Sequence, residues 1–463
     1  MKSERDSELE QKLFRLKTSF LAEPYTSSAL RIEKLKVLKS AIVNYKSALV
    51  EAARKDFSQR AELDTVMADM IPTVNHIEYI CRNLKHWMKP DKRNPGLEFL
   101  PSRTYVEYVP KGVVGIIAPW NYPIQLSLVP LATAIGAGNK VMLKLSEHTP
   151  NVNEVIKSIL SGLSAECTVI EGDAETGGKF SELLFNHLFF TGSSHIGKKV
   201  YQASASNLVP VTLELGGKSP VIVLSDANIE KVVLDLAFTK LMNCGQICVA
   251  PDYVLVHQEV FDALVCKLKE KFESMHTIND SSGLLNERHK TRLVSMLEQA
   301  KSKGVSVWHS KPLEAAVASD FGVHLVFEPP RGLKVMQEEV FGPILSIFKV
   351  RDLEHAQSIV RSTEVPLACY LYTSDKCAQN DVKYRLECGS LSINEMLLHV
   401  AVADLPFGGV GSSGIGQYHS IEGFKTFSHG KGIFHSSDKA WRSKLFDKYS
   451  HLIGKILTWL YLK

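Results

Sequence analysis

The chain has 463 residues, which is enough for two or three domains. Apolar residues make up 45% and charged residues 22% of the chain, as in a soluble globular protein, and the net charge of +4 is too slight to indicate a nucleic-acid-binding protein. Eight scattered cysteines predict a reducing compartment, and the charged start, residues 1–6, predicts no secretory signal, so we expect a cytoplasmic protein.

The stretch from Glu8 to about Trp87 is predicted to be helical. Apolar residues such as Leu13 and Leu16 recur at helical spacing, while charged residues fill the other face. This pattern indicates packing and not chemistry. A turn-rich connector, residues 89–96, separates the helices from a predicted strand at residues 102–109.

Strands and helices are predicted to alternate in the next part of the chain. Strands are expected at residues 111–118, 140–147, 169–172 and 188–191, with a helix at residues 126–137 between the first two. This order predicts a doubly wound α/β domain. Because ligands bind at the carboxyl ends of parallel strands, the polar residues at these ends are candidates for a site.

Two readings remain open for each of these polar strand ends. Asn121 could satisfy its own turn, or its side-chain amide could donate to a developing oxyanion. Lys144 and Glu147 could form a solvated ion pair or bind a ligand. Gly192 permits close approach of the backbone, and Ser193 can cap a helix whose amino end would face a pyrophosphate, although an ordinary helix cap has the same pattern.

Glu214 and Cys248 lie on two separate predicted turns. Glu214 is followed by two glycines and Lys218, and Gly245 shortly precedes Cys248, so the pair offers a candidate base and a candidate nucleophile. A buried structural cysteine is the alternative. Cys244 and Cys248 could suggest a metal, but no second cysteine pair or histidine cluster completes a zinc set, so we expect no metal.

A second α/β segment is predicted after Glu214. Strands are expected at residues 220–224 and 254–256, and helices at residues 229–243, 260–272 and 289–303. The alternation therefore continues through most of the chain.

Residues 214–218, with the sequence Glu-Leu-Gly-Gly-Lys, and residues 245–248, Gly-Gln-Ile-Cys, resemble the two signature motifs of the aldehyde dehydrogenase superfamily. Residues 243–253 resemble its class 3 branch, which includes fatty-aldehyde and coniferyl-aldehyde dehydrogenases. The similarity extends from the first helices to Phe427. It implies an α/β fold with a Rossmann-type cofactor domain, an α/β catalytic domain and a small β element for oligomerisation.

The resemblance also implies a division of the chain. We expect residues 1–212 to form the dinucleotide-binding domain, with residues 98–110 contributing to an oligomerisation strand element. Residues 213–395 are expected to form the catalytic domain with the nucleophilic cysteine. Residues 396–432 are expected to return to the cofactor domain and the oligomerisation element, and residues 433–463 to form a basic amphipathic tail.

The resemblance implies roles for the candidate residues. Cys248 would be the nucleophile, Glu214 the base that activates water, and Asn121 the donor to the oxyanion. Lys144 and Glu147 would hold the hydroxyls of the adenosine ribose.

Further cofactor contacts follow from the same resemblance. Glu339 would bind the nicotinamide ribose and Phe341 would pack beside the ring, as parts of a Glu-x-Phe-Gly-Pro motif. Leu145 stands where the family usually has proline. The remaining implied cofactor contacts are Trp120, Gly192, Ser193, Gly197 and Leu215.

The predicted reaction is the NAD(P)-dependent oxidation of an aldehyde to its carboxylic acid through a thiohemiacetal and a thioester. NAD is expected because Glu147 would repel a 2′-phosphate, with NADP also accepted. Apolar residues such as Tyr122, Ile124 and Leu397 favour a medium- or long-chain aliphatic or a coniferyl-type aromatic aldehyde. Transfer to coenzyme A is the alternative, and Glu214 favours water instead. The resemblance implies a homodimer.

The end of the chain, residues 441–463, has a different pattern. Leu445, Tyr449, Leu452 and other apolar residues fall on one helical face, and lysines and arginines supply positive charge. A basic amphipathic helix suits an anionic membrane surface and is too short in apolar length to span it. The alternatives are a helix packed on its own domain or across a dimer, and a non-catalytic membrane-associated protein on the same fold.

Overall fold

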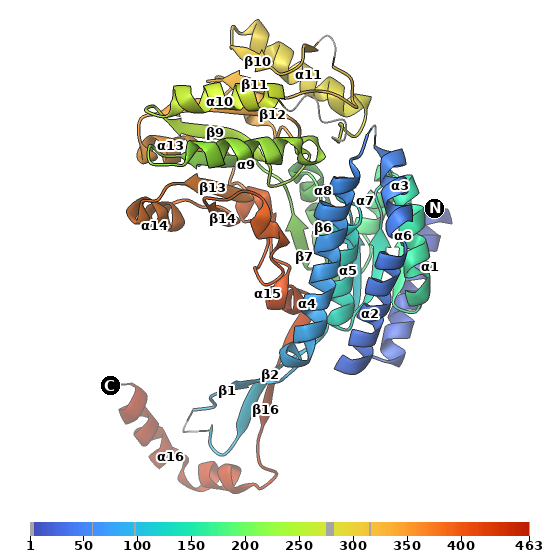
Figure 1. Cartoon of the computed structure of the whole chain (residues 1–463). Coiled ribbons are helices and arrows are strands. Elements are labelled where there is room, and N and C mark those ends of the chain that lie inside the picture. The colour runs from blue at the N-terminus through green and yellow to red at the C-terminus, as the bar shows by residue number, and fades with distance from the viewer. Residues whose placement is uncertain (1–3, 58, 97–98, 275–281, 314–315, 463) are drawn as a thin grey trace. The chain divides into compact units, whose positions relative to one another are not determined.

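The fold is described from a computed structural model, which describes residues 4–57, 59–96, 99–274, 282–313 and 316–462. The first three residues, residues 97 and 98 just after the predicted connector, and the lysine at the end of the tail lie outside this described part. The chain divides into two compact units (Figure 1). One comprises Met1–Trp87 and Pro110–Ser428, and the other Met88–Val109 and His429–Lys463.

Helices form the first part of the larger unit, as the apolar spacing predicts. Ser27 caps the second of them by accepting a hydrogen bond from the backbone N–H of Leu30. Their bounds are α1 Glu4–Ala22, α2 Ser28–Asn44, α3 Lys46–Asp56, the π-helix η1 Asp64–Met70 and α4 Ile71–Trp87.

The first sheet of the larger unit has six strands in the order β15-β7-β6-β3-β4-β5. Neighbouring strands are parallel except β15, which is antiparallel to β7. The strands are β3 Val113–Ile117, β4 Lys140–Lys144, β5 Cys167–Ile170, β6 His187–Thr191, β7 Val211–Glu214 and β15 Gly414–Ile415. Between and after them lie α5 Gln125–Gly136, α6 Pro150–Leu160, α7 Ala174–Ser181, α8 Ser194–Ala205 and α15 Ser420–Thr426. The predicted doubly wound α/β arrangement is confirmed.

The second sheet has seven strands in the order β10-β11-β12-β9-β8-β13-β14, with β10 antiparallel to β11 and the other pairs parallel. The strands are β8 Ser219–Val223, β9 Pro251–His257, β10 Val307–His309, β11 His324–Phe327, β12 Ile344–Val350, β13 Ala368–Tyr372 and β14 Ser390–Ile393. The helices are α9 Ile229–Leu241, α10 Phe261–Ser274, α11 Glu287–Ser302, α12 Lys334–Gln337, α13 Leu353–Arg361 and α14 Lys376–Arg385.

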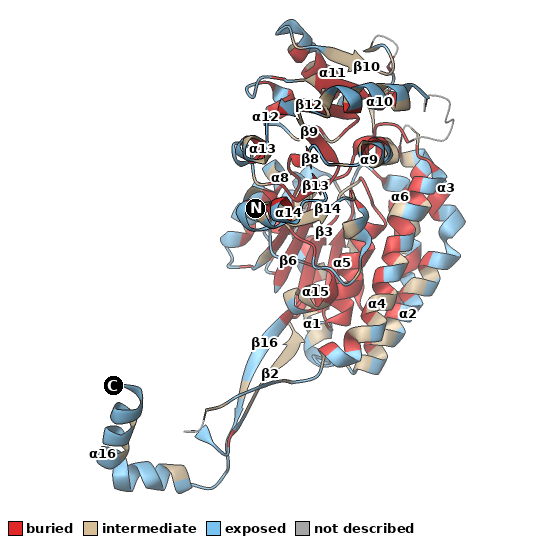
Figure 2. Ribbon diagram, turned by 60° about the vertical axis from the view of Figure 1, so that its left-hand side comes forward, coloured by how far each residue is buried: buried red, intermediate tan, exposed pale blue. Residues whose placement is uncertain are grey.

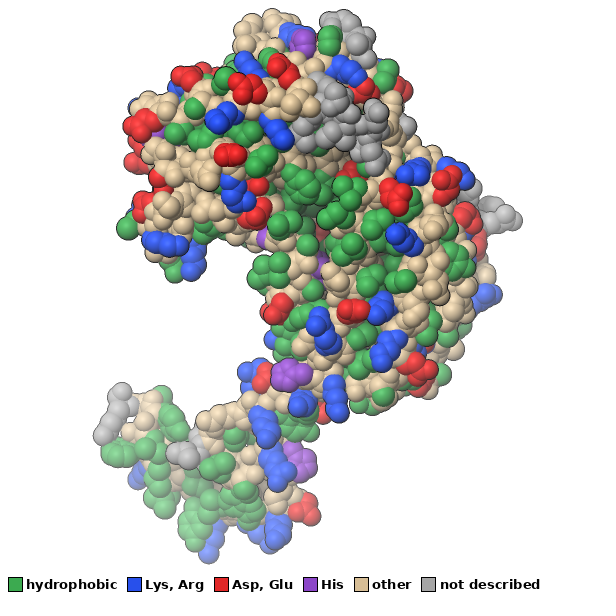
Figure 3. Space-filling view, viewed as in Figure 1, with side chains coloured by type: hydrophobic (Ala, Val, Ile, Leu, Met, Phe, Trp, Pro, Cys, Tyr) green, Lys and Arg blue, Asp and Glu red, His purple; other side chains and the backbone are tan. Residues whose placement is uncertain are grey.

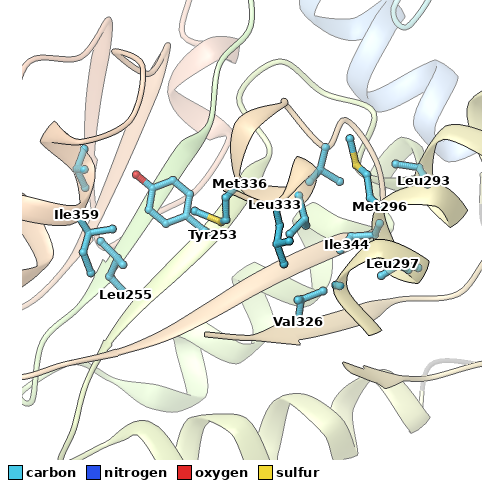
Figure 4. Close-up of a cluster of buried hydrophobic side chains, with 14 of the residues drawn as sticks. Tyr253, Leu255, Leu293, Met296, Leu297, Val326, Leu333, Met336, Ile344 and Ile359 are labelled. Carbon is cyan, nitrogen blue, oxygen red and sulfur yellow. The ribbon is translucent and has the colours of Figure 1, made fainter. Parts of the chain in front are cut away.

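One hydrophobic core holds the second sheet to its helices. Leu255 of β9 and Ile344 of β12 lie in it with Leu293 and Met296 of α11, and all four are fully buried (Figure 4). These strands read as near-continuous apolar runs because parallel strands are covered on both faces. The core fixes the strand ends that carry the candidate site.

The smaller unit is a three-stranded sheet followed by a helix. Its strands, in the order β1-β2-β16, are β1 Asp91–Arg93, β2 Arg103–Pro110 and β16 Ser428–His435. Helix α16 extends over Trp441–Tyr461 and buries none of its residues (Figure 2). Arg442 donates from Nη2 to the carbonyl oxygen of Phe99 at 2.7 Å, which ties the start of the helix to the segment just before β2. Among the residues that the structure describes, every helix is too short or too polar to span a bilayer.

Candidate active site

Cys248 follows a turn whose backbone is left-handed at three consecutive residues. Helix α9 ends at Leu241, two residues before its predicted end, because Asn243, Cys244 and Gly245 have φ values of 47°, 55° and 67°. At Gly245 a Cβ would stand 2.7 Å from the carbonyl oxygen of Gly342, so only glycine fits there. The turn therefore has a fixed shape just ahead of the thiol.

Gln246 locks this turn from inside the protein. Its Nε2 donates to the carbonyl oxygens of Asn243 at 2.8 Å and Gly283 at 3.1 Å, and its Oε1 accepts from the N–H of Leu285 at 2.8 Å. The side chain is fully buried and uses both ends of its amide. Cys248, two positions later, is half-buried.

The surroundings of Cys248 keep its thiol protonated. Burial, together with the nearby carboxylates of Glu339 and Glu214, raises the pKa of Cys248 to about 12. An ordinary thiol has a pKa of about 8.5, and only the thiolate is strongly nucleophilic. A reaction at this sulfur therefore needs an added positive charge or donor.

Glu214 is the last residue of β7, where it pairs with Thr191 of β6 and Gly414 of β15. Its side chain is buried, and neither carboxyl oxygen has a hydrogen-bond partner among the described residues. Burial holds the pKa of Glu214 well above its usual range. A carboxyl group in such a place can take a proton readily, which suits a general base.

Lys218 anchors the turn that follows Glu214. Its ammonium binds the carboxylate of Asp252 and donates to the carbonyl oxygens of Val335 at 2.8 Å and Glu338 at 3.0 Å. Asp252 in turn accepts from the N–H of Val340 at 2.8 Å. The contacts of Lys218 join the Glu-Leu-Gly-Gly-Lys turn to the segment that carries Glu339.

Asn121 follows β3 and contacts the turn before the thiol. Its Nδ2 donates to the carbonyl oxygen of Gln246 at 3.2 Å. Its own carbonyl oxygen accepts from Nη1 of Arg60 and from Nδ2 of Asn243, each at 3.1 Å. The structure thus joins the turn that carries Asn121 to the turn before Cys248.

Glu339 and Phe341 lie beside these turns. The Glu339 carboxyl group approaches Gly216 so closely that a Cβ added there would clash with it. Burial and the charge of Asp252 raise the pKa of Glu339 to about 8. Phe341 meets Trp120 edge-on with ring centroids 5.5 Å apart. The structure therefore brings Trp120 and Phe341 into contact with each other, and Glu339 against the Glu-Leu-Gly-Gly-Lys turn.

The other predicted cofactor residues lie at the ends of β4 and β6. Nζ of Lys144 lies 3.0 Å from Oε2 of Glu147. Ser193 caps α8 by accepting from the N–H of Ile196, and a Cβ on Gly197 would clash with the side chain of Leu215. The N–H of Gly192 donates to the carbonyl oxygen of Glu214 at 3.0 Å. No hydrogen bond among the described residues joins Lys144 or Glu147 to the cysteine.

Sequence reasoning missed Arg60, which it included in a region of packing. The structure places this buried arginine between Asn121 and Asn243. The residue stands alone in a polar stretch between two helices, so no spacing pattern could have identified it.

Comparisons with known proteins identify relatives of this chain. The sequence model of the aldehyde dehydrogenase family matches residues 22–433. A probable coniferyl aldehyde dehydrogenase of Pseudomonas aeruginosa is 39% identical, over 99% of this chain and 97% of its own length. The 4,4′-diaponeurosporen-aldehyde dehydrogenase of Staphylococcus aureus is 38% identical, over 93% of this chain and 94% of its own. A solved structure of Staphylococcus aureus AldH in a substrate-bound state has a TM-score of 0.87 and 37% identity, and it covers 93% of this chain and 94% of its own.

Proposed function

Because the chain belongs to the aldehyde dehydrogenase family, which oxidises aldehydes with NAD or NADP, we propose that it works through a thioester on Cys248. The observation that carries the proposal is the meeting of Cys248 and Glu214. Glu214 ends β7 of the first sheet and Cys248 lies just before β9 of the second, and the carboxylate of Glu214 contributes to the raised pKa of the thiol. This electrostatic interaction supports a nucleophile and a base that act at one site.

In the first half of the reaction, the thiol of Cys248 loses its proton to water and the thiolate sulfur forms a bond to the aldehyde carbon, while the carbonyl π bond breaks and its oxygen becomes an oxyanion. Nδ2 of Asn121 and the backbone N–H of Cys248 donate to that oxyanion, and one such donor is commonly worth about 3 kcal/mol. A nicotinamide cofactor, when bound here, would supply the acceptor for the hydride that leaves this carbon. Loss of hydride from the carbon leaves a thioester on Cys248.

In the second half, Glu214 takes a proton from water, and the resulting hydroxide attacks the thioester carbon. The carbon–sulfur bond then breaks, which releases the carboxylic acid and restores the cysteine. The apolar surroundings and free oxygens of the Glu214 carboxyl group support this role. A coenzyme A thiol could attack in place of water, and the buried base beside the sulfur favours water.

The residues at the strand ends fit a dinucleotide. The half-exposed Glu147, held by Lys144, suits the adenosine ribose, and it favours NAD over NADP because its charge repels a 2′-phosphate. The capped start of α8 suits the pyrophosphate. The buried Glu339 suits the nicotinamide ribose, with Phe341 and Trp120 beside the ring.

The substrate that we propose is a medium- or long-chain aliphatic aldehyde or a coniferyl-type aromatic aldehyde. Tyr122, Ile124, Leu126 and Leu397 are all buried apolar residues near the candidate site or in the turns that flank it. The relatives named for coniferyl aldehyde and for diaponeurosporen-aldehyde support a large apolar substrate.

For the assembly we propose a cytoplasmic homodimer that touches a membrane surface through α16. The edge strands β1 and β16 leave backbone groups free to pair with a second copy. Helix α16 exposes Leu445, Leu452 and Ile456, and basic side chains accompany them (Figure 3). This combination suits an anionic lipid surface.

The test of the reaction is the formation of reduced cofactor from hexanal, decanal, benzaldehyde and coniferyl aldehyde, with NAD and with NADP. The wild type should convert at least one of these aldehydes, and Cys248→Ala should not. Acid product without added coenzyme A supports water as the acceptor. Activity retained in Cys248→Ala would overturn the mechanism.

A further inference from the structure

Arg60 is a buried arginine whose guanidinium joins two turns of the proposed site. Its Nη1 donates to the carbonyl oxygen of Asn121 at 3.1 Å and to Oδ1 of Asn243 at 2.5 Å. Nδ2 of Asn243 donates to the same Asn121 carbonyl oxygen at 3.1 Å. The three residues therefore form a closed ring of hydrogen bonds between the turn of the oxyanion donor and the turn before the nucleophile.

Further contacts hold the guanidinium in place. It lies over the rings of Phe57 and Tyr122, 4.5 and 5.2 Å from their centroids. Its Nη2 lies 3.9 Å from Oδ2 of Asp69. At the start of α5, the N–H of Ile124 donates to the same Oδ2 and the N–H of Gln125 donates to Oδ1 of Asp69. The counter-ion of Arg60 thus fixes the helix that follows Asn121.

The turn before Cys248 is also held by Asp64, which lies in the same segment of the chain as Arg60. Oδ2 of Asp64 accepts from the N–H of Asn243 at 2.9 Å and from Oγ of Ser282 at 2.5 Å. Asn243 has a left-handed backbone, which a non-glycine residue adopts only when its surroundings enforce it. Arg60 and Asp64 supply that constraint from opposite sides.

Only part of the hydrogen-bonding capacity of the Arg60 guanidinium is used. Its Nε and Nη2 have no hydrogen-bond partner among the described residues, although the side chain is only 3% exposed. A buried charge with free donors is costly, and packed apolar residues of similar volume often serve stability as well or better. The role of Arg60 is therefore to hold the turns of Asn121 and Asn243 in position.

We propose that Arg60 is a positioning residue that sets the place of the Asn121 amide relative to the Cys248 sulfur. This inference rests on the roles proposed above for Asn121 and Cys248. Arg60 acts through Asn121 and Asn243. Without the two hydrogen bonds that Nη1 donates, the two turns lose their common anchor and the oxyanion donor shifts. Stabilisation of the oxyanion then falls, while binding of the aldehyde changes little.

The test compares Arg60→Met and Arg60→Lys with a matched control, Arg31→Met. Arg31 is also buried and donates to the backbone carbonyls of Gly136 at 3.1 Å and Thr26 at 3.0 Å, but it joins α2 to α5. We expect Arg60→Met to lower kcat about tenfold or more with KM changed less than about threefold. Arg31→Met should lower the melting temperature and retain kcat.

If Arg60→Met does not fold, the Arg60→Lys variant tests the proposal. Lysine keeps the charge, but it lacks the planar guanidinium that lies over the rings of Phe57 and Tyr122 and holds Nη1 in place, so we expect kcat to lie between wild type and Arg60→Met. A folded Arg60→Lys with wild-type kcat, or an Arg60→Met whose kcat is no lower than that of Arg31→Met, would overturn the proposal. Failure of the proposed function looks different, because wild-type turnover would then persist in Cys248→Ala.

Discussion

The ammonium of Lys218 binds the carboxylate of Asp252 and not that of Glu214, which lies four positions earlier in the chain. Glu214 therefore keeps both oxygens free of hydrogen bonds among the described residues, and burial raises its pKa. A cation held against Glu214 would lower this pKa and weaken it as a base. The pairing of Lys218 with Asp252 preserves the base while it anchors the turn.

Removing the base should separate the two halves of the reaction. We expect Glu214→Gln to form about one equivalent of reduced cofactor in the first turnover and then to turn over about a hundredfold or more slowly, because the thioester is no longer hydrolysed. Rapid-mixing absorbance measures both phases. Hydroxylamine, which attacks thioesters without a base, should restore turnover. A variant with no first-turnover phase would contradict this role.

The pH dependence of Cys248 alkylation follows from its raised pKa. Since the pKa of the thiol is about 12, iodoacetamide should modify Cys248 slowly at neutral pH in the absence of cofactor. The rate should rise about tenfold per pH unit as the thiolate fraction grows. Peptide mass spectrometry follows this site separately from the exposed Cys266 and Cys377. A rate that is flat between neutral and alkaline pH would refute the burial argument.

Glu339 should influence the thiol only when it is charged. Because the pKa of Glu339 is raised to about 8, its carboxyl group is neutral below that pH and repels the thiolate above it. Glu339→Gln should therefore alkylate at the wild-type rate below pH 8 and faster than wild type above it. The same mass-spectrometric assay measures this difference. An effect of equal size at all pH values would point to a change of packing instead.

Cofactor preference should shift when the charge of Glu147 is removed. Glu147→Gln should raise the ratio of kcat/KM for NADP to that for NAD about tenfold, since the repulsion of a 2′-phosphate disappears. Glu154→Gln is the matched control, because Glu154 also pairs with a lysine three positions away, Lys157, at 2.5 Å. If the ratio of kcat/KM for NADP to that for NAD is equal in wild type and Glu147→Gln, Glu147 does not contact the cofactor.

Helix α16 should direct the protein to anionic vesicles. We expect full-length protein to sediment with phosphatidylserine-containing vesicles, less so in high salt, while a chain that lacks residues 441–463 stays in the supernatant. Light scattering on both proteins controls for a change of oligomeric state. A full-length variant with Leu452→Asp and Ile456→Asp removes apolar surface without shortening the chain. Equal sedimentation of all three proteins would rule out membrane contact.

Much of the architecture could be predicted from local patterns. The parallel strands β3, β4 and β6 read as apolar, β-branched runs, and the helices between them show their apolar spacing. The predicted helical region before residue 88 is confirmed, as is the α/β fold. The end of α9 was predicted two residues late, because a left-handed turn at Asn243 has no local signal in a non-glycine residue.

The sequence by itself determined the family, the alternation of strands and helices, and the candidate residues Cys248, Glu214 and Asn121. It could do so because periodicity and short motifs are properties of neighbouring residues. Only the tertiary structure decided that Arg60 contacts Asn121 and Asn243, which lie 61 and 183 positions away from it. It also decided that Lys218 pairs with Asp252. Such contacts depend on how separate elements pack, and a buried polar group takes whichever partner that packing brings within reach.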